Sequence, residues 1–221
     1  MNRRMLRTTY HVEIEEINFT HGLPAWMTES PTGPSTASTH DYSDPYGSHY
    51  SMTPRGKAGD GVSLIGSPMS TSVVKVLEME AIGVTAAGPV ELSLGLASQL
   101  DEAASIRLDA VPADSGVASA GQVRLVLQDG TSKGETTLFA AGSAGTHRPT
   151  DIGTVIEDLD LAVIVDSEKK MAQAHLGYSY VSCGPQGFPV GQVLTPMVKA
   201  VLLAGGEASV KVRRVVIGTY T

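Results

Sequence analysis

The chain has 221 residues and a net charge of −7, with 42% hydrophobic and 18% charged side chains. That is enough apolar material for a core and too little charge for a disordered chain. The acidic balance argues against a groove that binds nucleic acid, which needs clustered Lys and Arg. No apolar run reaches the roughly 20 residues that cross a bilayer, so we expect no membrane insertion.

Turn-forming residues are abundant, since the chain has 24 Gly and 12 Pro against 5% aromatic residues. This composition is typical of many short strands. The single cysteine, Cys183, cannot form a disulfide within the chain, so the core must hold by packing. The N-terminus carries Arg3, Arg4 and Arg7 but no apolar signal core, and we expect synthesis in a reducing cytoplasm without export.

The first predicted strand covers 10–17, where Tyr10, Val12 and Ile14 alternate with polar residues and would line one face. Residues 20–61 have a different texture, rich in Pro, Gly, Ser, Thr, Tyr and His, in which no pattern persists. We expect this segment to be an irregular, loop-rich insertion around one or two short strands near 48–53. A segment of this length without regular structure is often functional or held by a neighbour.

Strand signals become regular from residue 62, with turn residues between them. Asp129-Gly130 is the sharpest of these turn signals, because this dipeptide favours tight hairpin turns. The predicted strands cover 62–65, 73–82, 90–96, 106–111, 123–127 with a return to 139, 159–165, 171–176, 197–203 and 208–217. The sequence therefore predicts a single all-β domain over 1–221, a two-sheet antiparallel sandwich of jelly-roll type with long N-terminal loops.

A cluster of aromatic, acidic and histidine side chains lies in the irregular segment. Tyr and Trp offer flat apolar faces with a polar tip, and Asp and His offer hydrogen bonds, which suits a sugar or a protein partner. We predict ligand or partner contact at Trp26, His40, Asp41, Tyr42, Tyr46, His49 and Tyr50, with Asp44 in the same cluster. Packing of this Tyr-rich loop on its own sheet, or on another subunit, is the main alternative. We expect no metal ion, because the histidines and aspartates lack the spacing of a known site.

Two pairs of carboxylates are spaced for one face of a strand, Glu78 with Glu80 and Glu13 with Glu15. A retaining glycosidase needs two such carboxyl groups close together beside a cleft. The strand around Glu78 has no tryptophan to stack a sugar and no third acidic residue in step, and a solvated strand face explains Glu13 and Glu15 equally well. We therefore expect no catalytic residue and no enzymatic activity. Nucleophile-elbow and phosphate-loop motifs are absent from the sequence, and we expect no cofactor.

Three segments resemble the concanavalin A-like (LamG-type) jelly-roll minor tail proteins of tailed phages that infect actinobacteria. The first is the Gly-Asp-Gly-Val-Ser-Leu-Ile-Gly stretch at 59–66, followed by Ser-Thr-Ser at 70–72 and the strand at 73–80. The second is Leu-Ala-Val-Ile-Val-Asp at 161–166 with its return strand, and the third is the closing strand at 208–217. Together they cover roughly 59–221, whereas 20–58 matches no segment of that family.

The resemblance implies a structural virion protein of a tailed phage, a minor tail protein made in the host cytoplasm and carried in the virion. It implies other tail proteins as partners, a homo-oligomer within the assembly, and contact with host-surface glycan as a secondary role. Many weakly binding copies on one particle would then act by avidity. Two alternatives on the same fold are a carbohydrate-active enzyme (a glycoside hydrolase) and a free carbohydrate-binding module.

Overall fold

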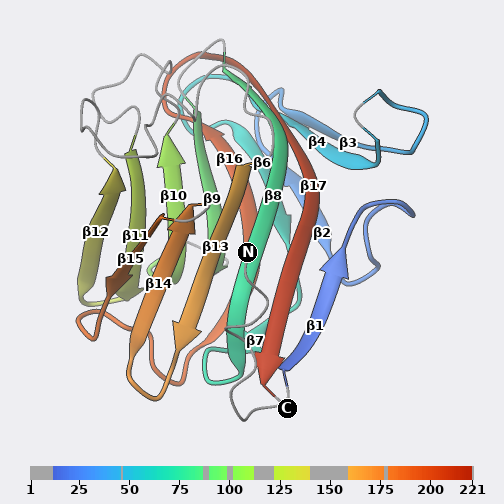
Figure 1. Ribbon diagram of the computed structural model, residues 1–221. Helices are drawn as coiled ribbons and strands as arrows, with labels where there is room; N and C mark the ends of the chain where they lie inside the picture. Colours follow the sequence, from blue (N-terminus) through green and yellow to red (C-terminus); the bar gives the residue numbers. More distant parts are fainter. Residues whose placement is uncertain are drawn as a thin grey trace.

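The computed structural model is all-β wherever it describes the chain, and its strands form two sheets that face each other (Figure 1). Paired strands run antiparallel throughout these residues. The described residues are 12–45, 47–86, 90–98, 102–111, 122–139, 159–176 and 179–220. The predicted two-sheet antiparallel sandwich is confirmed.

The first sheet, called sheet A, has nine strands in the described part of the chain. In spatial order its main path is β15 (Ser179–Cys183), β14 (Met171–Leu176), β13 (Leu159–Asp166), β8 (Val74–Ala86), β17 (Gly206–Tyr220), β4 (His49–Thr53) and β3 (Thr36–His40). Two further strands, β1 (Val12–Ile17) and β5 (Arg55–Gly56), also pair with β17. The closing strand β17 therefore organises sheet A.

The second sheet, called sheet B, has eight strands among the described residues. Its order is β12 (Lys133–Phe139), β11 (Gln122–Asp129), β10 (Ala104–Val111), β9 (Val90–Ala97), β16 (Val193–Leu202), β6 (Gly61–Ile65) and β2 (Thr28–Pro31), with β7 (Met69–Ser70) on β16. Strands β9 to β12 follow one another both along the chain and across the sheet, whereas β8 and β9 belong to different sheets. Chain neighbours thus form the left half of the sandwich in Figure 1, and long-range pairings close it.

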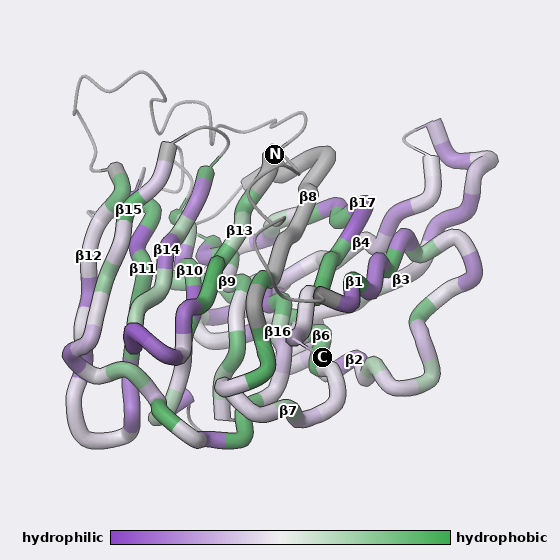
Figure 2. The backbone as a smooth tube through the Cα atoms, turned by 60° about the horizontal axis from the view of Figure 1, so that its bottom comes forward, coloured by the Kyte–Doolittle hydropathy of each residue, from purple (hydrophilic) through white to green (hydrophobic). Residues whose placement is uncertain are grey.

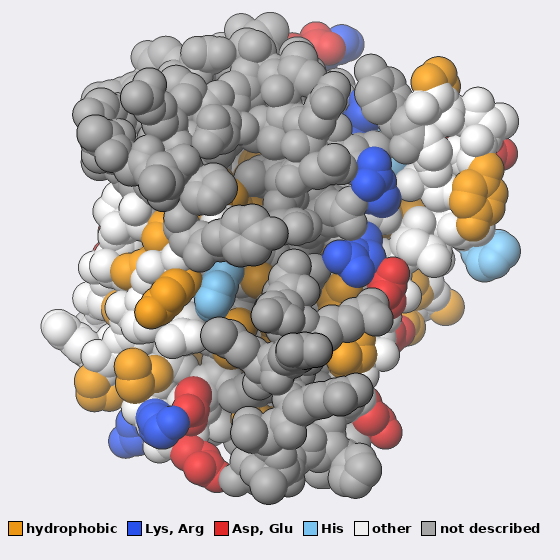
Figure 3. Space-filling model, in the orientation of Figure 1, with side chains coloured by type: hydrophobic (Ala, Val, Ile, Leu, Met, Phe, Trp, Pro, Cys, Tyr) orange, Lys and Arg blue, Asp and Glu red, His pale blue; other side chains and the backbone are white. Residues whose placement is uncertain are grey.

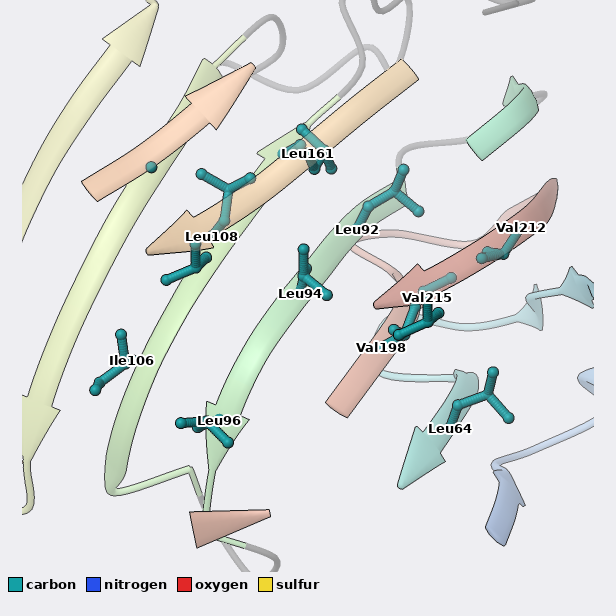
Figure 4. Packing of buried hydrophobic residues seen from close by; sticks show 14 of the residues in the cluster. Leu64, Leu92, Leu94, Leu96, Ile106, Leu108, Leu161, Val198, Val212 and Val215 are labelled. Carbon is teal, nitrogen blue, oxygen red and sulfur yellow. The ribbon is translucent and has the colours of Figure 1, made fainter. Parts of the chain in front are cut away.

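Alternation of apolar and polar residues decides which face of each strand turns inward. On β9, Leu92, Leu94 and Leu96 are at most 1% exposed, and on β10 Ile106 and Leu108 are fully buried. Each such side chain stabilises the fold by about 1.5–3 kcal/mol through removal of apolar surface from water. Figure 4 shows the core between the sheets, with labels on Leu64, Leu92, Leu94, Leu96, Ile106, Leu108, Leu161, Val198, Val212 and Val215.

The predicted hairpin at Asp129-Gly130 joins β11 to β12. Gly130 adopts a φ of 98°, in the left-handed region that favours glycine. The carboxylate of Asp129 accepts hydrogen bonds from the backbone N–H groups of Thr131 and Ser132, at 2.9 and 2.8 Å. The turn is therefore specified by its own residues, which explains why the sequence predicts it well.

The segment at 20–61 is more regular than expected. It contains β2, β3, β4 and β5, of which only β4 was expected, from the short strand near 48–53. The residues of β2 and β3 are exposed or half-buried on both faces, so no hydrophobic alternation marks them. Their strand conformation comes from pairing with β6 and β4. The β3–β4 hairpin projects from the body of the sandwich (Figures 1 and 2).

Strand β1 presents a different face from the one predicted. Ile14 is 56% exposed, whereas Ile17 is 4% exposed and packs in the core. The reason is that β1 is an edge strand paired only with β17 in the described structure, and it overlaps the core only at its end. Tyr10, which was expected to share the inward face, lies outside the described residues.

The outer face of sheet A mixes hydrophobic, polar and charged side chains where the structure describes it (Figure 3). No helix among the described residues has the length and apolar character needed to cross a membrane.

Candidate functional site

The structure brings three residues of the predicted loop cluster together on the β3–β4 hairpin. His40 and His49 are cross-strand partners at the end of the hairpin, and their rings stack with centroids 4.5 Å apart. Asp44 lies in the connecting turn, with its Oδ2 atom 3.3 Å from Nδ1 of His40. His49 is 1% exposed, while the side chains of His40 and Asp44 are 37% and 23% exposed.

Two other members of the cluster lie in the same turn with different contacts. The Asp41 carboxylate accepts hydrogen bonds from the backbone N–H and the hydroxyl of Ser43, so it stabilises the turn. Tyr42 is 74% exposed, and its hydroxyl accepts a hydrogen bond from Thr20 Oγ1 at 3.2 Å. Tyr46 lies outside the described residues.

Tyr50 and Trp26 point into the protein and not onto the exposed surface of the hairpin. Tyr50 is fully buried, packs its ring 5.5 Å from Phe19, and donates its hydroxyl hydrogen to Oε2 of Glu29 at 2.6 Å. Burial, and then the Glu29 carboxylate, raise the pKa of Tyr50. Trp26 is half-buried against the core, next to Gly66. Tyr50 and Trp26 therefore pack against the protein itself, which was the alternative to ligand contact for this cluster.

A second group of polar residues lies on the outer face of sheet B, where sequence reasoning expected none. Register places Asp109 of β10 between Ser93 of β9 and Arg124 of β11. The next outward position on β10 is Arg107, and the next on β9 is Glu91. We call this group, with the charged residues linked to it by salt bridges, the sheet B network. Its members are Glu91, Ser93, Glu102, Arg107, Asp109, Arg124, Lys133, Glu135 and Lys199.

Asp109 is the centre of the sheet B network and is 0% exposed. Its two oxygens share the single N–H of Arg107 Nε in a bifurcated hydrogen bond, at 3.0 and 3.1 Å, and Oδ1 also accepts a hydrogen bond from Ser93 Oγ at 2.8 Å. Nη2 of Arg124 lies 3.6 Å from its other oxygen. A buried carboxylate needs such compensation, since an unpaired charge in a protein interior costs several kcal/mol.

Glu91 shares the guanidinium of Arg124 with Asp109, at 2.6 Å from Nη2. Burial, followed by the nearby Asp109 carboxylate, raises the pKa of Glu91, and Arg124 partly offsets this effect. The two carboxyl groups thus differ in environment. Asp109 is held by two cations, whereas the pKa shift of Glu91 favours its protonated form.

Salt bridges extend the sheet B network across neighbouring strands. Glu102 precedes β10 and contacts both Arg107, at 3.3 Å, and Lys199 of β16. On β12, Glu135 lies 2.7 Å from Lys133 and 3.7 Å from Arg124. Hydrogen bonding to Lys133 lowers the pKa of Glu135. The result is a continuous set of alternating donors and acceptors on one face of a rigid sheet.

The sequence holds one signal for this site, which was missed. Ser105, Arg107 and Asp109 alternate with Ile106 and Leu108, so the polar face of β10 carries a basic and an acidic residue two positions apart. The residues that complete the network come from β9, β11, β12 and β16. Their meeting depends on strand register, which the sequence alone does not reveal.

The carboxylate pairs considered from the sequence lie on sheet A. Glu13 and Glu15 are exposed on β1. The backbone of β8 pairs Glu78 with Val216 and Glu80 with Arg214, but the side chains of these two glutamates lie outside the described part of the structure. On sheet B, Glu91 and Asp109 instead share one partner, because both lie near Nη2 of Arg124.

No protein-family model matches the sequence, and no curated protein sequence is detectably similar to it. Solved structures share the fold. A glycoside hydrolase family 16 endo-glucanase from Bacteroides ovatus superposes with a TM-score of 0.60 and 10% identity, covering 92% of this chain and 99% of that chain. The kappa-carrageenase from Pseudoalteromonas carrageenovora superposes with a TM-score of 0.58 and 10% identity, covering 100% of both chains. The CBM2 module of the evolved Dit of Lactobacillus casei BL23 phage J-1 superposes with a TM-score of 0.57 and 13% identity, covering 96% of this chain and 98% of that chain.

These likenesses define the chain as a jelly-roll sandwich of the concanavalin A-like type. They also contradict the expectation that the chain has no enzymatic activity, because glycoside hydrolases are prominent among the structures with this fold. Enzymatic activity was excluded from the sequence because Glu78 and Glu80 form only a weak motif. That reasoning did not consider the carboxyl groups of sheet B. That exclusion is withdrawn.

Proposed function

We propose that this chain is a carbohydrate-recognition protein that binds an oligosaccharide across the outer face of sheet B. The observation that carries the proposal is the sheet B network itself, with two guanidinium groups fixed around the buried Asp109. Sugar hydroxyls both donate and accept hydrogen bonds, so they are matched by alternating carboxylates and guanidinium groups. Side chains already held by salt bridges lose little entropy on binding.

The charge balance of the network favours a neutral glycan over an anionic one. In the described part of this face, basic and acidic groups are equal in number: Arg107, Arg124, Lys133 and Lys199 with Glu91, Glu102, Asp109 and Glu135. A surplus of cations would be needed to attract sulfate or carboxylate groups strongly. The structural neighbours support a carbohydrate ligand in general, since they include an endo-glucanase, a carbohydrate recognition domain and a CBM2 module.

A calorimetric titration tests this proposal directly. We expect the purified chain to bind a neutral β-glucan oligosaccharide more tightly than a sulfated carrageenan oligosaccharide. The variant Arg124→Ala should reduce the affinity about tenfold or more, because each charge-assisted hydrogen bond contributes about 1.5–3 kcal/mol. Arg55→Ala is the matched control, since Arg55 also pairs with a glutamate, Glu207, but on sheet A. Equal affinity of both variants, with both folded, would refute the assignment to sheet B.

A second candidate function, glycoside hydrolysis, is favoured by the contrast between Glu91 and Asp109. A retaining glycosidase uses one carboxyl group as the acid and a second, nearby one as the nucleophile or stabilising anion. The raised pKa of Glu91 suits the acid, and the two guanidinium groups on Asp109 suit the anion. Reducing-end assays on β-glucans distinguish the two functions. Glu91→Gln should abolish hydrolysis while oligosaccharide binding persists, and wild-type protein that binds without cleaving would exclude this second function.

We also propose that the chain works in the tail of a phage virion, in contact with neighbouring tail proteins and with copies of itself. The resemblance over 59–221 supports this setting, as does the similar fold of the phage J-1 Dit module. The projecting β3–β4 hairpin, with the exposed Tyr42, is the partner contact in this arrangement. Mass spectrometry of purified phage particles is the test. Absence of the chain from particles whose genome encodes it would overturn the proposal.

A further inference from the structure

We propose that His40, Asp44 and His49 form a binding site for a divalent transition-metal ion such as Zn²⁺. One ligand atom from each of these residues lies within 4.8 Å of the other two. The spacing of the residues along the sequence gave no reason to expect such a site. The fold supplies it, because the β3–β4 register sets His40 opposite His49 and the turn carries Asp44 back over them.

The distance between His40 and Asp44 matches the span of two ligands on one ion. Nδ1 of His40 and Oδ2 of Asp44 are 3.3 Å apart. Two ligand atoms on a tetrahedral zinc, each about 2.0–2.1 Å from the metal, stand roughly 3.4 Å apart. The ligand atom of His49 lies within 4.8 Å of the other two, so it closes a gap of at most roughly 1.4 Å when its ring turns out of the stack on His40.

Hydrogen bonds to the other ring nitrogens fix which nitrogen of each imidazole is turned to the cluster. Nδ1 of His49 is 2.8 Å from the carbonyl oxygen of Gly47. Because a carbonyl only accepts, this nitrogen carries the proton and the lone pair of the neutral ring lies on Nε2. Nε2 of His40 is 3.0 Å from the Ser38 hydroxyl, which leaves Nδ1 to face Asp44. Metal-binding histidines characteristically donate their second N–H to a carbonyl or another polar group in this way.

The donor set decides the class of ion. Two imidazoles and one carboxylate suit zinc and related transition metals, whereas calcium and magnesium require mainly oxygen ligands. Three protein ligands leave a fourth tetrahedral position for water or for a group from a partner. His40 and Asp44 are partly exposed, so solvent reaches this side of the site. The ion would fix the turn that carries Tyr42, at the tip of the projecting hairpin.

Titration of the untagged full-length chain with zinc chloride tests the proposal, with cobalt(II) absorption as a second readout. We expect one ion per chain in the wild type. His40→Gln and Asp44→Asn should each weaken binding about 100-fold or more, because each removes a direct ligand. His21→Gln and Asp129→Asn are the matched controls, since His21 is an exposed histidine outside the cluster and Asp129 is an aspartate with similar backbone contacts in the β11–β12 turn.

The ion should also raise the melting temperature of the wild type and of both controls, but not of the two ligand variants. Melting curves in the presence of a chelator show whether His40→Gln and Asp44→Asn still fold like the wild type. Binding that survives in both ligand variants overturns the proposal. A wild-type chain that binds neither zinc nor cobalt overturns it as well. These readouts do not depend on glycan binding, so the metal site and the proposed function can fail separately.

Discussion

Arg107 donates its Nε–H to both carboxylate oxygens of Asp109, two residues further along the same strand. Residues at i and i+2 on a strand project from the same face, so β10 builds this pair without help from the rest of the fold. The fold then adds Ser93 and Arg124 from the neighbouring strands. A buried ion pair on the outer face of a sheet costs desolvation energy, which these hydrogen bonds have to offset.

The first prediction concerns the charge of Asp109. Replacement by Ala leaves the guanidinium groups of Arg107 and Arg124 poorly compensated in a largely buried position. Removing one partner of a buried pair typically costs about 3–5 kcal/mol, so Asp109→Ala should lower the free energy of unfolding by that amount. Urea denaturation measures it. Asp109→Asn keeps one of the two acceptor oxygens and should cost less, whereas equal losses for both variants would contradict the role of these contacts.

The second prediction concerns the space beside Arg107. Gly95 of β9 lies opposite Arg107, and a Cβ atom placed on Gly95 would lie 2.2 Å from the Ile106 carbonyl oxygen and 2.6 Å from Arg107 Cα. Backbone atoms must move to accept a methyl group there. We expect Gly95→Ala to destabilise the fold by about 1–3 kcal/mol and to weaken glycan binding by displacing Arg107.

Gly205→Ala is the matched control for this substitution. A Cβ on Gly205 would lie 3.5 Å from its nearest neighbouring atom, the Gly56 carbonyl oxygen, which is an ordinary contact. Its melting temperature should equal that of the wild type. If Gly95→Ala were as stable as Gly205→Ala, the close approach of β9 and β10 would have no energetic consequence.

The sequence predicts the sandwich well where local signals and burial agree. The strands at 90–96 and 106–111 carry strict alternation, and Asp129-Gly130 marks its own turn. It fails for β3, whose polar residues take strand conformation only through pairing with β4. It also does not reveal the sheet B network. Glu91 and Arg124 are 33 residues apart, and only the register of β9, β10 and β11 brings them into contact.

The third prediction concerns the hydrogen bond between the two sheets at their common edge. The hydroxyl of Tyr50, on β4 of sheet A, donates to Glu29, on β2 of sheet B. Because Glu29 is exposed, its carboxylate returns to water when the hydroxyl is removed. Tyr50→Phe should therefore lower the free energy of unfolding by only about 1 kcal/mol, and Tyr50→Ala by about 3–5 kcal/mol, since it also leaves a cavity. Tyr42→Phe, at an exposed position, should leave the urea midpoint unchanged.

The fourth prediction is a pH dependence that originates at His175. This residue lies on β14 opposite Tyr180 of β15, with the two rings stacked at 5.5 Å. Its Nε2 atom is buried and has no hydrogen-bond partner among the described residues. Burial lowers the pKa of His175 from its usual value of 6.5.

The sign of the effect follows from which state binds the proton first. As pH falls, the unfolded chain protonates His175 at its ordinary pKa, while the folded chain resists until a lower pH. The neutral ring therefore contributes its full stabilisation above pH 6.5, and this contribution is lost as pH falls through that value towards the folded-state pKa. Urea unfolding of the wild type between pH 5 and 8 should show this loss, and His175→Gln should show a smaller one. The difference between the wild-type and His175→Gln stabilities at each pH isolates His175 from the other histidines. Parallel pH dependences of the two proteins would contradict the prediction, because the ring would then titrate alike in the folded and unfolded chain.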